Sequence, residues 1–198
     1  MSRPAVFLDR DGTINEEVGY IHELEKLNLI PGAALAIRGL NALGVPVILV
    51  TNQSGPARGY YPESWIHDLH ERLVQLLAAE GARLDGLYYC PHLPDGSVAE
   101  FSFACDCRKP EPGMLRQAAA EHDLDLSRSF MIGDKATDVE VGERAGTRTI
   151  LLTSGYGERV LAGTYQHQVS PDHVCPTLQE AWELVLAPFF RQYFSEQF

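Results

Sequence analysis

The chain has 198 residues, of which 45% are hydrophobic and 22% charged, and a formal net charge of −11. This composition allows a sizeable core, so a single domain over residues 1–198 is expected. The negative charge would repel nucleic acid and anionic membranes, and neither is an expected partner. The first residues lead directly into a short apolar run, and no apolar stretch is long enough to cross a bilayer, which predicts a soluble cytoplasmic protein.

Short apolar runs alternate with segments of helical periodicity along the chain. The runs predict strands buried on both faces, in the order Ala5–Leu8, Val45–Val50, Leu84–Tyr89, Phe130–Ile132 and Thr149–Leu152. Helices are predicted at 33–43, 62–79 and 113–122, each near a proline, and after capping-box pairs at Thr137 with Glu140 and at Thr177 with Glu180. The alternation predicts an α/β fold with a doubly wound, mainly parallel sheet.

Two segments interrupt this alternation, at 12–28 after the first strand and at 91–112 after the third. Long loops at strand ends often carry function. Neither the segment after Gly12 nor the region after Thr51 is long enough to hold a large cap domain. At the other end of the chain, Pro188 should break the last helix and leave an aromatic tail at about 188–198, which packs on the domain or on a partner. Cys175, in a short apolar strand, is expected in the core.

Two carboxylates follow the first strand in the segment VFLDRDGT at residues 6–13. Asp9 lies at the carboxyl end of the strand, where open α/β sheets bind ligands, and Asp11 can face the same pocket. Two carboxylates in one pocket can act as nucleophile and general acid when their pKa values are pushed apart. The alternative is a polar strand-to-turn junction without chemistry, since Asp and Gly favour turns.

Three further segments place polar side chains after a predicted strand or before a helix. VILVTNQ (47–53) ends in a hydroxyl and an amide, RKP (108–110) precedes a helix, and FMIGDK (130–135) delivers Asp134. Each segment is weak evidence alone, and the basic pair could be a solvated one. Together with DxDGT, and in this order, they resemble the four motifs of the haloacid dehalogenase superfamily.

This resemblance implies a phosphatase in which Asp9 attacks the phosphorus of a small phosphorylated metabolite. Asp11 would protonate the leaving oxygen and then deprotonate the water that hydrolyses the aspartyl-phosphate. Thr51 and Asn52 would donate hydrogen bonds to the phosphoryl oxygens, and Lys109 would neutralise charge on the transferring group.

The resemblance also implies a fold and a metal. The fold would be a Rossmann-like sheet of the haloacid dehalogenase type without a large cap domain. Magnesium prefers one or two carboxylates together with phosphate and water, so Asp9, Asp134 and the backbone carbonyl of Asp11 would hold catalytic Mg²⁺. Asp138 would lie behind this shell or at a helix start.

Three of the four cysteines lie close together in a loop at about 90–107. Cys90 with His92, and Cys105 with Cys107, form C-x-H and C-x-C pairs whose members point to the same side of an extended chain. Three thiolates and one imidazole match a closed structural Zn²⁺ site. Such a site would pin the loop beside the basic pair, whereas the alternative is a set of buried or redox cysteines.

The zinc loop, TNQSG (51–55) and CRKP (107–110) resemble the heptose bisphosphate phosphatases, which supply heptose for lipopolysaccharide. This similarity implies removal of the C7 phosphate of heptose 1,7-bisphosphate. The implied substrate contacts are Glu17, Val18, Gly19, Tyr20, Asn52, Gln53, Ser54, Arg108, Lys109 and Lys135. A bisphosphate needs a second anion clamp, and Arg108 with Arg58 or Lys135 could supply it.

Three other functions fit parts of the pattern. Histidinol-phosphate phosphatases share the zinc-loop pattern, and Glu17 could receive the amine of that substrate. A phosphorelay receiver also combines aspartate, threonine and lysine in an α/β fold, although an adjacent acid/base such as Asp11 would shorten the life of its phosphate. A non-catalytic, zinc-stabilised binding protein is the third. The expected partner is a small phosphorylated sugar, bound by a monomer.

Overall fold

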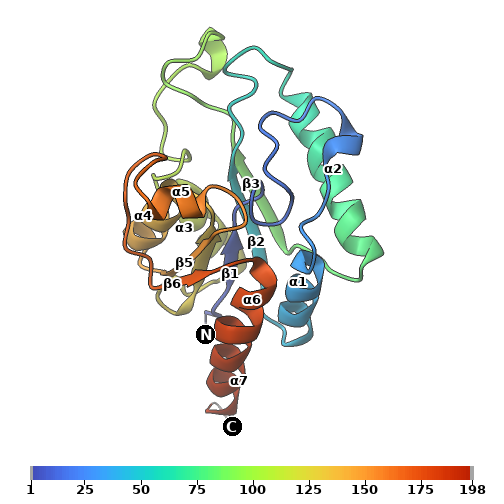
Figure 1. Cartoon of the computed structure of the whole chain (residues 1–198), viewed down its shortest axis with the longest axis vertical. Coiled ribbons are helices and arrows are strands. Elements are labelled where there is room, and N and C mark those ends of the chain that lie inside the picture. The colour runs from blue at the N-terminus through green and yellow to red at the C-terminus, as the bar shows by residue number, and fades with distance from the viewer. Residues whose placement is uncertain (1, 197–198) are drawn as a thin grey trace.

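The computed structural model describes residues 2–196, and within them six strands form one parallel sheet in the order β3-β2-β1-β4-β5-β6 (Figure 1). All five neighbouring pairs are parallel, which confirms the predicted doubly wound sheet. The strands are β1 (Val6–Leu8), β2 (Val47–Asn52), β3 (Gly86–Cys90), β4 (Phe130–Gly133), β5 (Arg148–Leu152) and β6 (His173–Cys175).

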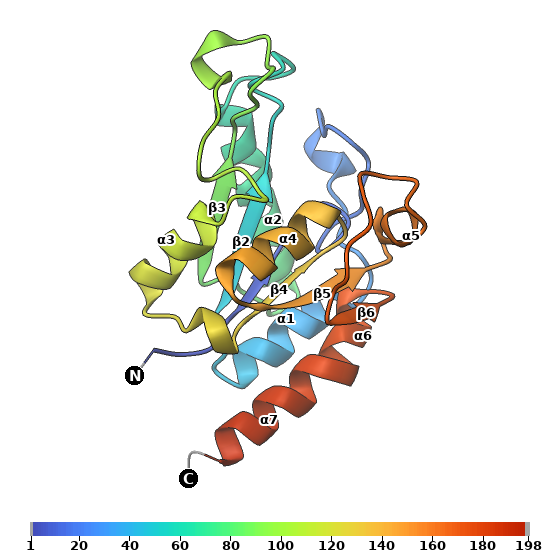
Figure 2. The ribbon, with the colours of Figure 1, turned by 90° about the vertical axis from the view of Figure 1, so that its left-hand side faces the viewer.

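Helices cover both faces of this sheet (Figures 1 and 2). One face packs against α1 (Ala33–Ala42), α2 (Ser64–Ala79), α6 (Leu178–Ala181) and α7 (Ala187–Ser195). The other face packs against α3 (Gly113–His122), α4 (Ala136–Ala145) and α5 (Gly157–Leu161). Among the described residues, no helix combines the length and apolarity that a bilayer span requires.

The long segment between β1 and α1 contains only a 3₁₀ turn at Leu24–Lys26, so no cap domain is inserted there. The loop after β3 likewise contains only a 3₁₀ turn, at Ala99–Phe101. Alternate residues of the strands face opposite layers of the core: Val6 and Leu8 belong to one hydrophobic cluster and Phe7 to the other. Cys175 is buried at the end of β6, as predicted.

Two predictions about the strands were wrong in detail. β2 begins two residues later than predicted and continues through Asn52, which places Thr51 and Asn52 within the strand. β3 is not buried on both faces, since its residues are half-buried up to Tyr89. The reason is its place at the edge of the sheet, where it pairs with β2 alone among the described strands.

The predicted capping box of α4 was also misplaced. The N-cap is Lys135 and its partner is Asp138, whose carboxylate accepts from the Lys135 backbone N–H at 3.0 Å. The helix therefore starts two residues earlier than Thr137 and Glu140 would require. At α6 the prediction was confirmed, because Thr177 is the N-cap, accepts from the Gln179 N–H and contacts Glu180.

Pro188 does not break the last helix, contrary to prediction. It lies in the first turn of α7, directly after a π-helical turn at Trp182–Leu186, and proline is tolerated at the start of a helix. The aromatic tail is thus helical as far as Ser195, while Gln197 and Phe198 lie outside the described residues. It packs on the domain, with Phe190 fully buried against Phe130 of β4.

We expect Phe190→Ala to lower the free energy of unfolding by about 3–5 kcal/mol, because it removes a buried ring from the core under β4. Leu184→Ala, at a side chain in the same helical segment that is 68% exposed, should change it by no more than about 0.5 kcal/mol. Denaturant unfolding measures both values, and equal values would show that the tail contributes nothing to the core.

Candidate active site

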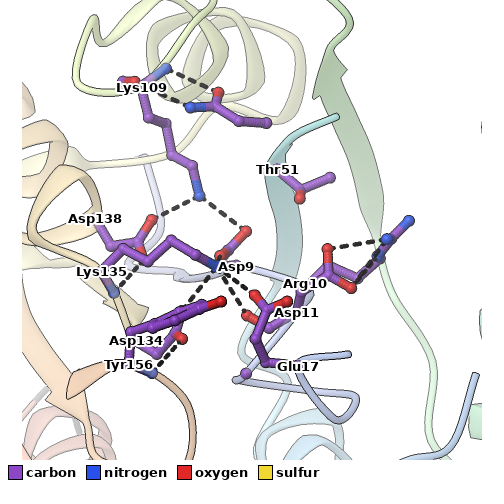
Figure 3. Close-up of polar contacts among 12 residues, drawn as sticks. Asp9, Arg10, Asp11, Glu17, Thr51, Lys109, Asp134, Lys135, Asp138 and Tyr156 are labelled. Atoms are coloured by element: carbon purple, nitrogen blue, oxygen red, sulfur yellow. Dashed lines mark hydrogen bonds and ion pairs between the residues drawn. The ribbon is translucent and has the colours of Figure 1, made fainter. Parts of the chain in front are cut away.

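The functional residues gather at the carboxyl ends of β1 and β4 (Figure 3). These strands are neighbours in the middle of the sheet, at the point where the strand order reverses, which is where doubly wound sheets bind ligands. Asp9 follows β1 and Asp134 follows β4, and the Asp9 N–H donates to the Ile132 carbonyl at 2.9 Å. The sheet register therefore sets the two carboxylates side by side.

Asp9 is buried and ion-paired with Lys109 (Figure 3). The Lys109 ammonium lies 2.9 Å from Asp9 Oδ1 and 2.7 Å from Asp138 Oδ1, and it donates to the Val50 carbonyl at 2.9 Å. Burial alone would raise the pKa of Asp9, but the ammonium groups of Lys109 and Lys135 outweigh it and hold this pKa at about 2. Asp9 is thus an ionised, desolvated carboxylate, which is the form required of a nucleophile.

A second group of charges surrounds Asp134. Its Oδ2 accepts from the Tyr156 backbone N–H at 2.8 Å, and its Oδ1 lies 3.2 Å from the Lys135 ammonium. Burial, assisted by the charges of Asp9 and Asp138, raises the pKa of Asp134 to about 7 although Lys135 opposes the shift. Oxygen atoms of Asp9, Asp134 and Asp138 lie within 4.8 Å of one another, so these carboxylates could hold a metal ion.

Gly12 is required by this packing. Its φ is +80°, a conformation that side chains rarely adopt, and an added Cβ would lie 2.3 Å from Asp134 Oδ2. The glycine of the DxDGT segment therefore allows the turn after β1 to approach the Asp134 carboxylate.

The Asp11 carboxylate points away from Asp134 and is held by three donors. Arg10 binds it in a fork, with Nη2 at 2.9 Å from both carboxylate oxygens, and Asn15 and Gln53 each donate at 2.9 Å. Burial would raise the pKa of Asp11, but Arg10 and Lys135 lower it overall. The backbone carbonyl of Asp11 faces Lys135 Nζ at 3.4 Å, on the side of Asp134.

Arg10 is a functional residue that the sequence did not indicate. Its side chain is only 2% exposed, although an arginine between two aspartates in a turn suggests a solvated position. The Arg10 side chain is buried because its guanidinium pairs with the Asp11 carboxylate. No local sequence pattern predicts that pairing.

The end of β2 contributes a hydroxyl and two amides. Thr51 is buried and lines the site. The Asn52 side chain makes a reciprocal pair with the backbone of Lys109, donating to its carbonyl and accepting from its N–H, both at 3.0 Å. Asn52 thus positions Lys109, whereas the resemblance implied donation to phosphate.

The loop after β1 places two of its four predicted contacts firmly in the site. Glu17 pairs with Lys135 at 2.9 Å, and the Tyr20 hydroxyl lies 3.2 Å from Ser54 Oγ. Gly19 lines the adjoining cavity. Val18 is 51% exposed and lines neither cavity, so the structure does not bring it to the other predicted residues.

Several of these residues, Asp9 among them, line a cavity of about 240 Å³. The guanidinium-bearing residues Arg58 and Arg108 line it, as do Tyr165 and Gln166, which the sequence analysis did not select. Tyr165 stacks on Tyr156 with ring centroids 4.0 Å apart. A polar loop after a short helix gives no periodic or motif signal, which is why this wall was missed.

The predicted zinc ligands converge on one point. Cys90, His92, Cys105 and Cys107 form a group that could hold a metal ion. The described ligand-atom contacts, among the three Sγ atoms and His92 Nδ1, are 3.1–3.6 Å. A tetrahedral zinc ion with bonds of about 2.0–2.3 Å separates its ligands by roughly 3.5–3.8 Å, so the ligand atoms would need to move apart by at most about 0.7 Å.

Comparisons with known proteins agree with this geometry. A family model described as HAD-hydrolase-like matches residues 106–181. The chain is 54% identical over 195 residues to a D-glycero-D-manno-heptose-1,7-bisphosphate 7-phosphatase of Thermosynechococcus vestitus, covering 95% of this chain and 100% of that protein. It is 49% identical to the D-glycero-beta-D-manno-heptose-1,7-bisphosphate 7-phosphatase of Yersinia pestis, covering 77% and 82%.

A solved structure shares the whole architecture. It is the D,D-heptose 1.7-bisphosphate phosphatase from B. bronchiseptica complexed with magnesium and phosphate, with a TM-score of 0.82 and 32% identity over 93% of this chain and 99% of that chain. This comparison and the one with the Thermosynechococcus vestitus protein both cover nearly the full length of this chain. The chain therefore belongs to the family of HAD-like heptose bisphosphate phosphatases.

Proposed function

We propose that the protein hydrolyses the C7 phosphate of D-glycero-D-manno-heptose 1,7-bisphosphate through an aspartyl-phosphate on Asp9. The observation that carries the proposal is the ionised Asp9 carboxylate, which is buried beside the ammonium groups of Lys109 and Lys135 and lines the cavity. The substrate class, a heptose 1,7-bisphosphate, is the one for which the relatives are named. A cytoplasmic location and a monomeric state remain predictions from the sequence.

The residues present fit a divalent cation, because oxygen atoms of three buried carboxylates, Asp9, Asp134 and Asp138, lie within 4.8 Å of one another. Burial raises the pKa of Asp134, and a bound cation would favour its ionised form. Asp9, Asp134 and the Asp11 carbonyl would hold Mg²⁺, which when bound offsets repulsion between Asp9 and the phosphate. Asp138 is committed to Lys109 and to the Lys135 N–H, so it supports the site from behind.

The chemistry then follows from the chain's own residues. An Asp9 oxygen forms a bond to phosphorus while the bond from phosphorus to the sugar oxygen breaks, and Lys109 and Thr51 stabilise the charge on the transferring oxygens. Asp11 gives a proton to the leaving oxygen and later takes one from the water that hydrolyses the aspartyl-phosphate. Since its carboxylate pairs with Arg10 in this structure, and Arg10 and Lys135 lower its pKa, Asp11 must leave this pair, take up a proton from solvent and turn toward the leaving oxygen to act.

The positively charged lining favours a bisphosphate. Arg108 lines the same cavity as Asp9 and is held by its own donation to the His92 carbonyl at 2.9 Å, so a phosphate at the far end of the sugar would meet a positioned guanidinium. Lys135 adds a further cation to the lining of this cavity. Histidinol phosphate would need an acid for its amine, and Glu17 is already paired with Lys135.

We also propose that the cysteine loop binds structural Zn²⁺. All four positions are filled by side chains, which leaves no open position for substrate. Burial raises the pKa of the Cys107 thiol to about 11, so without a cation this thiol would stay protonated. Zinc would hold the thiolates and fix the loop that precedes Arg108 and Lys109.

We expect Asp9→Asn to reduce phosphate release from the bisphosphate by at least about 10³-fold, because an amide cannot attack phosphorus. The far-UV circular dichroism should not change. Asp68→Asn, an exposed change of the same kind on α2, should leave the rate within about twofold. An Asp9→Asn protein that retains the activity would contradict the proposed mechanism.

A substrate panel tests the assignment itself. With Mg²⁺, kcat/KM for heptose 1,7-bisphosphate should exceed that for histidinol phosphate by at least about 10²-fold, since only the former carries a second phosphate for Arg108. Addition of a chelator should abolish both activities. Comparable, poor rates on the two substrates would defeat the heptose assignment.

Metal analysis tests the zinc proposal. Purified protein should contain about one Zn²⁺ per chain, and Cys107→Ser should lose it, because three ligands bind zinc less tightly than four. Cys175→Ser is the matched control, since Cys175 is buried in β6, apart from the cluster, and should leave zinc content unchanged. Zinc-free wild-type protein of normal stability would refute the proposal.

A further inference from the structure

Arg58 is a cation on the wall of the cavity that the reaction chemistry does not use. It lies in the loop after β2 and lines the same cavity as Asp9 and Arg108. Its Nε is 3.4 Å from Ser54 Oγ, and its guanidinium lies 5.9 Å from the centre of the Tyr20 ring. These contacts engage one edge and one face of the guanidinium and leave its two terminal nitrogens free for a ligand.

The charge of Arg58 is uncompensated. Arg10, Lys109 and Lys135 are each ion-paired to carboxylates of the site. Within residues 2–196, neither Arg58 nor Arg108 makes an ion pair, although the chain carries a net charge of −11. Two unpaired guanidiniums on one cavity wall match a second anionic group of the substrate, because bidentate binding of phosphate is characteristic of arginine.

The loop that carries Arg58 is fixed by the cysteine loop. The carbonyl of Ala57, next to Arg58, accepts from the Ser97 and Val98 backbone N–H groups at 2.7 and 3.0 Å. Figures 1 and 2 show these two loops side by side at the end of the molecule opposite α7. Gly96 makes this approach possible, since a Cβ there would lie 2.6 Å from the Ala57 carbonyl oxygen.

We infer that Arg58 binds the phosphate of the sugar that is not transferred, and that the cysteine loop positions it through the contact of Ala57 with residues 96–98. The cysteine loop would then hold both arginines, since Arg108 donates to the carbonyl of His92 in the same loop. This inference rests on the proposed function. Arg58 is a specificity-determining residue, and Gly96 is a positioning residue that does not touch substrate.

The test compares heptose 1,7-bisphosphate with heptose 7-phosphate, which lacks the second phosphate. Arg58→Gln should raise KM for the bisphosphate about tenfold with little change in kcat, because it removes binding that is equal in ground and transition states. The constants for the monophosphate should stay within about twofold. Arg58→Lys should give an intermediate KM, since it keeps the charge but loses the fork.

Arg116→Gln is the charge-matched control, at an exposed arginine of α3 that does not line the cavity, and should leave both substrates unaffected. A calorimetric titration with heptose 1-phosphate gives a readout independent of turnover, and Arg58→Gln should weaken this binding by about the same tenfold. Equal losses on the two sugars, or no loss on either, would overturn the role of Arg58. Wild-type protein inactive on both sugars would overturn the proposed function, while the titration would still test Arg58.

Gly96→Ala tests the positioning step. It should raise KM for the bisphosphate severalfold and spare the monophosphate, with the zinc content of wild type, because the added methyl group pushes the turn away from Ala57 and leaves the cysteine ligands in place. An unchanged KM in a protein of unchanged melting temperature would show that the loop contact does not position Arg58.

Discussion

The ammonium group of Lys109 is the contact on which the rest of the site depends. It lies between the carboxylates of Asp9 and Asp138 and donates to the carbonyl of Val50, so this buried side chain joins the segment after β1 to α4 and β2. A buried lysine without such partners would lose its proton, whereas here the carboxylates outweigh burial and raise its pKa.

The sheet makes this arrangement possible at low entropic cost. β1 has only three residues, yet it pairs on both sides, so the backbone that carries Asp9 has no freedom left to lose when substrate binds. Hydrogen bonds from the side chains of Arg10, Asn15 and Gln53 restrict the Asp11 carboxylate as well. The Asp9 carboxylate is thus fixed by ammonium groups. The Asp11 carboxylate is held by hydrogen bonds, from which it must be released to act.

The site residues that could be predicted from the sequence are those at the ends of strands. Asp9, Thr51 and Asp134 follow apolar runs, and parallel strands bring such positions to one edge. Prediction failed where the outcome depends on partners distant in the chain. The burial of Arg10, the half-exposure of β3 and the contact of Ala57 with Ser97 follow from strand order and loop packing, which have no local signature. Pro188 was misjudged because a general rule about helix interiors was applied to a helix start.

The reciprocal pairing of Asn52 with Lys109 has a consequence for the mechanics of the molecule. A carboxamide that both donates to and accepts from one residue reproduces the hydrogen bonding of a peptide group, so the Asn52 side chain joins the backbone of Lys109 to the end of β2. Lys109 belongs to no strand, yet it is joined to the lattice of the central sheet. A movement of the loop that precedes Lys109 would therefore also displace the end of β2.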